Sequence, residues 1–281
     1  MSGLAVAGLG LIGGSVARCA RSRGDRVIGF DPDPETATYA REHRLVDETV
    51  AQLSGLFERA ETLVVAAPLE ATLEILEQCA GREPDGVRLI VDVASVKAPL
   101  LPFVARVRGF VPTHPLAGGE GSGPRASRAD LFAGRPWAYV PAGDERLDAL
   151  AVAFIASMCA RPVALDAAHH DRVVALTSHV PQLLSTILAA ELAGHDDASI
   201  AELYGPGLES MLRLARSGWP MWSSLVAANA GSIARGLRAL AGSATAAADR
   251  IEAGDFSELQ ALFERANAFT ERLDARSHDR R

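Results

Sequence analysis

A glycine-rich turn near the start of the chain constrains the fold more than any other feature. The apolar residues 4–7 are followed by Gly8-Leu9-Gly10-Leu11-Ile12-Gly13, with glycines spaced G-x-G-x-x-G, and then by residues 16–23, which suit a helix. Such glycines let backbone N–H groups at a helix N-terminus approach a pyrophosphate without interference from side chains. The order of strand, turn and helix predicts a dinucleotide site. The alternative is a glycine-rich turn in another kind of α/β protein.

An acidic residue after the second predicted strand indicates which dinucleotide binds. Residues 27–30 form an apolar run that ends at Asp31, at the distance from the glycines where a carboxylate can bind the ribose hydroxyls of adenosine. A carboxylate there would repel the 2′-phosphate of NADP, and residues 32–35 contain no arginine to neutralise that phosphate. The sequence therefore favours NAD over NADP.

The carboxyl ends of the predicted strands mark the rest of the cofactor site. Ligands of open parallel sheets bind beyond these ends, so we expect Pro68, Asp92 and His114, which follow three apolar runs, to converge on one crevice. The residues expected to contact the cofactor are Gly8, Gly10, Leu11, Ile12, Gly13, Asp31, Pro68 and Asp92.

The pattern of apolar segments changes near residue 165. Before it, short apolar runs alternate with helical stretches, which is typical of a parallel sheet covered on both faces. The expected strands are 3–8, 26–31, 62–67, 88–93, 109–113, 136–140 and 162–165, and the expected helices are 12–24, 35–43, 70–80, 98–107 and 145–159. Further helices are expected at 167–193, 198–204, 207–217, 220–240, 243–253 and 256–275. The predicted class is α/β, with a Rossmann-type parallel sheet domain (residues 1–165) followed by an all-helical dimerisation domain (residues 166–281).

Composition narrows the range of partners. The formal net charge of −7 over 281 residues argues against nucleic acid or an anionic membrane as a partner. No apolar run is expected to span a membrane, and the three scattered cysteines have no disulfide or metal spacing. We expect a cytoplasmic protein without a metal site that binds a small-molecule substrate. Because long Ala- and Leu-rich helices need a partner surface, we also expect a homodimer formed through the helical domain.

Two groups of polar residues follow predicted strands. The segment Asp92–Lys97 closes the strand at residues 89–91 and contains the only lysine among 28 basic residues. This suggests a position that needs a compact ammonium, and the alternative is codon bias that left one lysine here by chance. For the segment as a whole, the alternative is an ordinary turn in which Ser95 caps the next helix. His114 precedes a glycine-rich loop, and an imidazole at the mouth of a dinucleotide crevice can accept the proton of an alcohol during oxidation. A structural histidine is the alternative there.

A third group lies on the first predicted helix of the second domain. It runs from His170 and Asp171 to His179 and Pro181. Proline within a helix removes one backbone hydrogen bond, so Pro181 should free the carbonyl of Thr177 and produce a kink.

These segments together resemble the prephenate/arogenate dehydrogenase family of tyrosine biosynthesis. The matching pieces are GLGLIGGS at 8–15, DVASVK at 92–97, HPLAGGEGSGPRASRADLFAGRPW at 114–137, HDRVVALTSHVPQLL at 170–184 and MLRLARSGWPMWSSLVAAN at 211–229. The glycine motif is generic. The HP-x-AG loop with its later LF-x-x-RPW, followed by HDRV-x-ALTSH-x-P, is specific, and it identifies the chain as a member of this family.

The resemblance implies an NAD-dependent oxidative decarboxylation of a cyclohexadienol, with prephenate giving 4-hydroxyphenylpyruvate, CO2 and NADH. In the family, the histidine matching His114 hydrogen-bonds the ring hydroxyl as hydride leaves its carbon, and the serine matching Ser95 orients that histidine or the hydroxyl. His179 is implied to line the substrate pocket, and Arg213 to bind a substrate carboxylate. Trp222 is implied to shape the pocket near the dimer interface.

Two points stay open in this implied site. Arg216, one turn beyond Arg213, could be the carboxylate clamp instead. The loop Gly119-Glu120-Gly121 lacks a hydroxyl and a cation that many relatives carry beside the glutamate. Because this loop contacts the substrate side chain in the family, arogenate and 4-amino-4-deoxyprephenate are alternatives to prephenate, and Glu120 could bind the ammonium of arogenate.

Two related kinds of enzyme and one kind of non-enzyme protein are alternatives to this function. A β-hydroxyacid dehydrogenase or an imine reductase has a related architecture, but the former usually needs a catalytic lysine in the helical domain, and this chain has none there. A non-catalytic NAD-sensing protein is the alternative outside enzymes. The presence of His114, Ser95, His179 and Arg213 argues against it.

Overall fold

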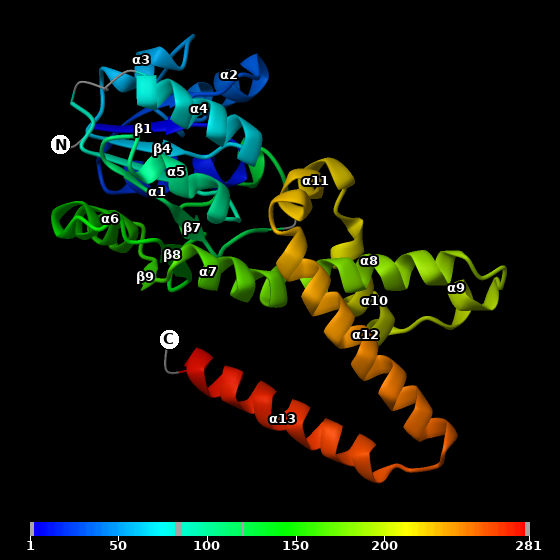
Figure 1. Cartoon of the computed structure of the whole chain (residues 1–281). Helices are drawn as coiled ribbons and strands as arrows, with labels where there is room; N and C mark the ends of the chain where they lie inside the picture. Colours follow the sequence, from blue (N-terminus) through cyan, green and yellow to red (C-terminus); the bar gives the residue numbers. More distant parts are fainter. Residues whose placement is uncertain (1–2, 82–85, 120, 279–281) are drawn as a thin grey trace. The chain divides into compact units, whose positions relative to one another are not determined.

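The computed structural model describes residues 3–81, 86–119 and 121–278. Contacts divide the chain into two compact units (Figure 1). The sheet unit comprises Met1–Val174 and Trp219–Ala228, and the helical unit comprises Ala175–Gly218 and Asn229–Arg281. The boundary at residue 165 stays a prediction.

The sheet unit is built on a six-stranded parallel sheet in the order β3-β2-β1-β4-β5-β6. Its strands are β1 (Gly3–Ala7), β2 (Arg26–Phe30), β3 (Glu48–Thr49), β4 (Thr62–Val65), β5 (Leu89–Asp92) and β6 (Phe110–Val111). The strand order reverses between β1 and β4, and ligands of such sheets bind beyond the carboxyl ends of the strands at this point. The predicted Rossmann-type class is confirmed.

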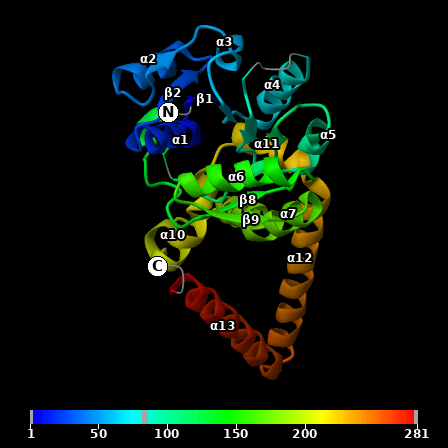
Figure 2. The same ribbon diagram turned by 90° about the vertical axis from the view of Figure 1, so that its left-hand side faces the viewer.

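Helices cover both faces of this sheet. Successive side chains of a strand point to opposite faces, so each strand contributes to two hydrophobic cores. Leu4 and Val6 pack with one core and Ala5 and Ala7 with the other. The helices on the first face are α1 (Leu11–Ser22), α2 (Pro34–Glu42) and α6 (Glu145–Ser157). Those on the second are α3 (Ser54–Phe57), α4 (Leu69–Gly81) and α5 (Leu101–Val104). Figure 2 shows α1 and α4 on opposite sides of the strands.

A second, smaller sheet corrects the predicted strand arrangement. The strands β7 (Thr113–Pro115), β8 (Pro136–Tyr139) and β9 (Arg161–Ala164) form a separate sheet, in which β7 runs antiparallel to β8. The expected strand at 109–113 is therefore divided between two sheets. Pro112 lies at the division, where it has no N–H to donate to either ladder.

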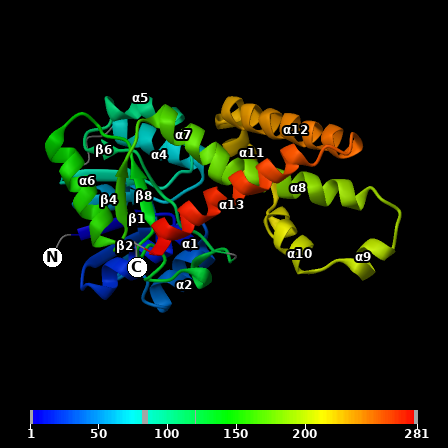
Figure 3. The same ribbon diagram turned by 90° about the horizontal axis from the view of Figure 1, so that it is seen from below.

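The helical unit contains α8 (Val180–Ala193), α9 (Ser199–Leu203), α10 (Pro206–Leu212), α12 (Ala230–Glu252) and α13 (Ser257–His278). Figure 3 shows α9 in the connection between α8 and α10, and a short turn that joins α12 to α13. The expected break near residue 242 is absent, because Gly242 lies inside α12. A glycine among alanines in an exposed helix costs only about 1 kcal/mol. The break falls instead at Asn229, between α11 (Trp219–Ala228) and α12.

Pro181 has a visible effect on its helix. Helix α7 (Ala167–Val174) is followed by a π-helical segment, Ala175–His179, and then by α8. A π turn just before proline accommodates the missing N–H by changing the local hydrogen-bond pattern. The kink expected at Pro181 stays a prediction.

The expectation that no apolar run could span a membrane is corrected by the same helix. Ala167–Ala193 is 27 residues long and has a window of mean hydropathy 1.5, so by length and composition alone it is apolar enough to cross a membrane. It also carries the buried residues His170 and Asp171. Asp171 accepts backbone hydrogen bonds from Lys97 and Ala98 within the sheet unit. A core helix of a folded domain passes the same compositional test.

Candidate functional site

The glycine-rich turn between β1 and α1 leaves no room for side chains at two of its positions. Gly8 has φ +93°, and a Cβ atom there would lie 2.2 Å from the carbonyl oxygen of Ala66. A Cβ on Gly13 would lie 1.9 Å from the carbonyl oxygen of Gly8. Gly10 differs, because nothing lies within 4 Å of its Cβ position. The turn is therefore packed against the sheet behind it and open beside the N-terminus of α1, as a phosphate-bearing ligand requires.

Asp31 lies just beyond β2 and is tied to the same turn. Its Oδ2 accepts the N–H of Leu9 at 2.7 Å, and its Oδ1 accepts the N–H of Asp33 at 3.0 Å. An ionised carboxylate can accept about four hydrogen bonds. The half-buried Asp31 can therefore hold the turn in place and still accept further hydroxyl groups.

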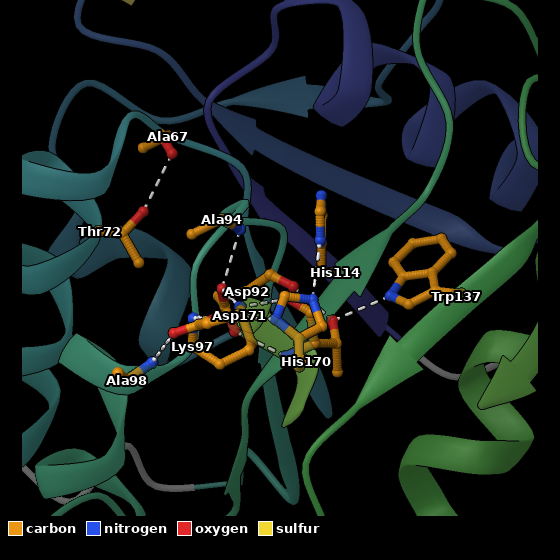
Figure 4. A network of polar contacts seen from close by, with 11 residues as sticks. Ala67, Thr72, Asp92, Ala94, Lys97, Ala98, His114, Trp137, His170 and Asp171 are labelled. Carbon is orange, nitrogen blue, oxygen red and sulfur yellow. Dashed lines mark hydrogen bonds and ion pairs between the residues drawn. The ribbon is translucent and has the colours of Figure 1, made fainter. Parts of the chain in front are cut away.

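Asp92 and Lys97 form a fully buried ion pair at the carboxyl end of β5 (Figure 4). The ammonium of Lys97 donates to Asp92 Oδ2 and to the carbonyl oxygen of Thr113. Asp92 also accepts the N–H groups of Ala94 at 2.9 Å and Thr113 at 2.8 Å. The pair thus ties the 92–97 turn to β7, the strand that carries His114.

Burial acts on both members of this pair in opposite directions. It raises the pKa of Asp92 and lowers the pKa of Lys97, because each loses the water that would stabilise its charge. Each charge offsets part of the cost of the other. The sole lysine is fully enclosed, which fits the expectation of a position suited to a compact ammonium. Asp92, which is predicted to contact the cofactor, is also fully buried, and it accepts the N–H of Ala94 in the turn after β5.

His114 stands at the end of a chain of three buried side chains (Figure 4). Its Nδ1 lies 3.0 Å from Nε2 of His170, and Nδ1 of His170 lies 2.8 Å from Oδ1 of Asp171. Asp171 in turn accepts the N–H groups of Lys97 at 2.8 Å and Ala98 at 2.9 Å. The carboxylate of α7 therefore caps the turn after β5.

The capping carboxylate is held in its ionised form. Burial raises the pKa of Asp171, but the hydrogen bonds from His170, Ala98 and Lys97 outweigh burial and hold the pKa below its usual range. The N-cap residue of the 3-10 helix Ala98–Leu100 is Lys97 and not Ser95, and the side chain of Lys97 makes no cap hydrogen bond. Ser95 itself is half-buried in the turn.

Two further predicted positions lie at the same edge of the sheet. Pro68 begins the turn into α4, and its carbonyl oxygen accepts the N–H of Thr72 at 2.8 Å. Gly119 follows β7 in an exposed loop, where its Cβ position is 3.9 Å from Leu11. The loop after His114 thus comes close to the first turn of α1, where Leu11 and Ile12 are half-buried. Glu120 lies outside the described residues.

The helical unit contains two of the predicted substrate residues. His179 is fully buried, with its Nδ1 3.3 Å from the side-chain nitrogen of Asn229. Arg213 is exposed between α10 and the 3-10 helix Leu214–Arg216.

Side chains of α8 hold the segment that carries Arg213. Gln182 donates to the carbonyl oxygen of Leu214 at 2.7 Å, and Ser185 donates to that of Met211 at 2.6 Å. The two carbonyls flank Arg213 in sequence.

Trp222 is half-buried on α11, in the sheet unit. The structure therefore brings Asp92 and His114 into one network, while the roles of His179, Arg213 and Trp222 stay predictions.

The sequence alone predicts no role for His170 or Asp171. The adjacent pair at the start of a helix was visible in the sequence, but its partners are Lys97, Ala98 and His114, which lie more than fifty residues earlier. Such a link becomes apparent only when α7 is packed beside the turn after β5.

The fold and site define a nucleotide-binding α/β domain joined to a helical domain. A family model described as prephenate dehydrogenase, nucleotide-binding domain, matches residues 16–162. A second, prephenate dehydrogenase, dimerization domain, matches residues 166–265. The chain belongs to the prephenate dehydrogenase family.

Known relatives agree with this assignment. The chain is 33% identical over 235 residues to NovF of Streptomyces niveus, a probable prephenate dehydrogenase. That match covers 81% of this chain and 63% of the relative, so the chain spans less than two thirds of that relative's length. Prephenate dehydrogenase of Bacillus subtilis is 28% identical over 80% of this chain and 63% of its own length.

A solved structure extends the likeness over the whole chain. Arogenate dehydrogenase of Synechocystis has a TM-score of 0.82 and 26% sequence identity, covering 96% of this chain and 99% of the other.

Proposed function

We propose that this protein catalyses the NAD-dependent oxidative decarboxylation of prephenate to 4-hydroxyphenylpyruvate, CO2 and NADH. The observation that carries the proposal is the position of His114 on β7, next to Thr113, which Asp92 and Lys97 tie to the carboxyl end of β5. The specific HP-x-AG and HDRV-x-ALTSH-x-P motifs and membership of the family support it.

The glycine turn, the N-terminus of α1 and Asp31 would hold NAD. The open position beside Gly10 and the oriented Asp31 carboxylate suit a pyrophosphate and a ribose, respectively. Bound NAD would supply the acceptor for the hydride of the substrate. Leu11, Ile12, Gly13 and Pro68 complete the proposed cofactor contacts.

The chain's own residues would direct the chemistry of the substrate. His114 would take the proton of the ring hydroxyl as hydride leaves the same carbon, which turns the C–O bond into a carbonyl. When the bond to the ring carboxylate breaks, its electron pair enters the ring, and the oxygen takes a proton back to give a phenol. Because the product is aromatic, the enzyme mainly has to orient the substrate and move this proton.

Four residues would bind and orient the substrate. In this proposal Arg213 clamps a carboxylate, His179 lines the pocket, Ser95 orients the hydroxyl, and Trp222 shapes the pocket wall. A planar guanidinium can hold a carboxylate by two parallel hydrogen bonds.

Replacing Arg213 tests the clamp. We expect Arg213→Ala to raise KM for the dienol about 10- to 100-fold and to change kcat less, because binding is lost before the chemical step. Arg216→Ala is the matched control, since both arginines are exposed in the same segment. If Arg216→Ala raises KM and Arg213→Ala does not, the clamp is Arg216.

Arogenate is the second candidate substrate, and 4-amino-4-deoxyprephenate is the third. The reason is local: Gly119 and Gly121 stand where many relatives carry a hydroxyl and a cation beside the glutamate, here Glu120. The likeness to a solved arogenate dehydrogenase also favours testing arogenate.

The test is NADH formation by the purified protein, with prephenate and arogenate offered separately. Turnover of either supports the function, and the ratio of the two kcat/KM values assigns the substrate. If neither reacts, 4-amino-4-deoxyprephenate is tried next. NAD binding without turnover of any of the three would contradict the enzyme proposal and favour the NAD-sensing alternative.

We also propose a cytoplasmic homodimer formed through the helical unit. The match of residues 166–265 to a dimerization domain supports it. Large apolar side chains on α13 are half or more exposed, including Phe263 at 69% and Phe269 at 53%. Such a surface is unusual on a helix that remains in water.

A further inference from the structure

The hydrogen-bond chain that ends at His114 has a direction that can be derived. Both oxygens of Asp171 accept backbone N–H groups, from Lys97 at 2.8 Å and from Ala98 at 2.9 Å. An ionised carboxylate can only accept. The contact of 2.8 Å between Oδ1 and His170 Nδ1 therefore requires a proton on that nitrogen.

The proton on Nδ1 of His170 also determines which nitrogen of His114 carries a proton. When His170 is neutral, its single proton on Nδ1 leaves Nε2 as an acceptor. That acceptor lies 3.0 Å from Nδ1 of His114, and His170 is only 1% exposed. Nδ1 of His114 must then carry a proton and donate it to this bond. A neutral imidazole has one proton, so Nε2 of His114 is the basic nitrogen.

We propose that His170 and Asp171 are positioning residues that hold His114 in the tautomer needed to accept the substrate proton. Asp171 fixes the tautomer and ring orientation of His170, and His170 does the same for His114. The role in turnover rests on the proposed function, in which His114 accepts the hydroxyl proton. The tautomer itself does not depend on it.

Asp171 also couples this chain to the turn after β5. The carboxylate that orients His170 caps the backbone at Lys97 and Ala98. Lys97 in turn donates to the carbonyl oxygen of Thr113, the residue before His114. Helix α7 and the turn after β5 therefore hold both the backbone before His114 and its ring. This fixes the position and orientation of the imidazole.

The tautomers can be read directly in the full-length protein. With ¹⁵N in its seven histidines, two-bond ¹H–¹⁵N correlations distinguish an Nδ1–H ring from an Nε2–H ring. Variants His114→Gln and His170→Gln assign the two sets of signals. We expect Nδ1–H at both rings, and an Nε2–H ring at His114 would overturn the proposal. Because no substrate is present, this result is independent of the proposed activity.

Two substitutions of His170 test its role in turnover. In His170→Gln an amide oxygen can stand near the position of Nε2 and still accept from His114, whereas His170→Leu removes the acceptor. We expect His170→Leu to lower kcat about 10- to 100-fold with KM and NAD affinity changed by about twofold or less, and to convert His114 to Nε2–H. His170→Gln should recover most of kcat and the Nδ1–H signal.

The control is His169→Gln, an exposed histidine on the same helix, which should leave kcat and the spectra of His114 unchanged. Wild-type kcat in His170→Leu, or equal losses in the Leu and Gln variants, would overturn the positioning role. If the wild-type protein oxidises none of the three candidate cyclohexadienes, the proposed function fails. The tautomer measurement still shows whether His170 and His114 carry their protons on Nδ1.

Discussion

His114 meets two demands that usually conflict in a single residue. It is 8% exposed and held through Nδ1, while the proposed chemistry needs its other nitrogen to accept a proton. A partner that itself has a fixed proton position resolves the conflict, because the ring is anchored by one nitrogen and acts through the other. Lys97 contributes at the same scale by holding the preceding residue, Thr113, through its carbonyl oxygen.

Replacing His114 tests the residue on which the proposed chemistry depends. We expect His114→Asn to lower kcat about 10²- to 10⁴-fold, the usual contribution of a positioned acid or base, with little change in the affinity for NAD. Steady-state NADH formation and calorimetric titration with NAD measure the two quantities. His195→Asn, an exposed histidine of the helical unit, is the control. Normal turnover by His114→Asn would remove this residue from the mechanism.

At the scale of elements, two glycines of the turn between β1 and α1 have different roles: Gly8 is needed for packing, and Gly10 leaves space for a ligand. Gly8 sits where a Cβ would meet a backbone oxygen, and its φ of +93° disfavours any other residue. We expect Gly8→Ala to reduce the free energy of unfolding by about 2 kcal/mol or more. Gly10→Ala has open space and should keep its stability, yet weaken NAD binding about tenfold where a methyl group would meet the pyrophosphate. Urea unfolding and NAD titration of both variants check this. Equal stability losses would contradict it.

Contact between α7 and the turn after β5 gives stability that depends on pH. The pKa of Asp171 is lower in the folded protein than its ordinary value of about 3.9. The unfolded chain therefore takes up the proton first as pH falls. The contribution is complete above the unfolded pKa and is lost as pH falls through the folded pKa.

We expect Asp171→Asn to lower the free energy of unfolding by about 1–3 kcal/mol at pH 7, because the N–H groups of Lys97 and Ala98 lose a charged acceptor. The difference from wild type should shrink as the pH falls below about 4. Urea unfolding from pH 7 to pH 3 measures it, with exposed Asp196→Asn as the control. A difference that stays constant over this range would contradict the ionised cap.

The elements themselves were largely readable from the sequence, for identifiable reasons. Strands β1, β2, β4 and β5 are short apolar runs closed by glycine, proline or acidic residues, and buried parallel strands have that appearance. The second sheet could not be anticipated, because apolar runs give no strand direction. Likewise, His170 and Asp171 form an ordinary helix start until their distant partners are known. Pairing across more than fifty residues is a property of packing, which local patterns do not encode.

At the scale of the whole molecule, α13 presents an apolar face that is about half exposed in the single chain. Leu262, Phe269 and Leu273 are spaced by seven and four residues and lie on one side of the helix, each 41% exposed or more. If this face is covered in the proposed homodimer, Phe269→Asp should raise the dimer dissociation constant at least about tenfold, because a carboxylate would lose water on association. Light scattering over a range of protein concentrations measures the constant, and Ala268→Asp, which points away from this face, is the control. A dimer equally stable in both variants would place the interface elsewhere, whereas a monomeric wild type would contradict the homodimer itself.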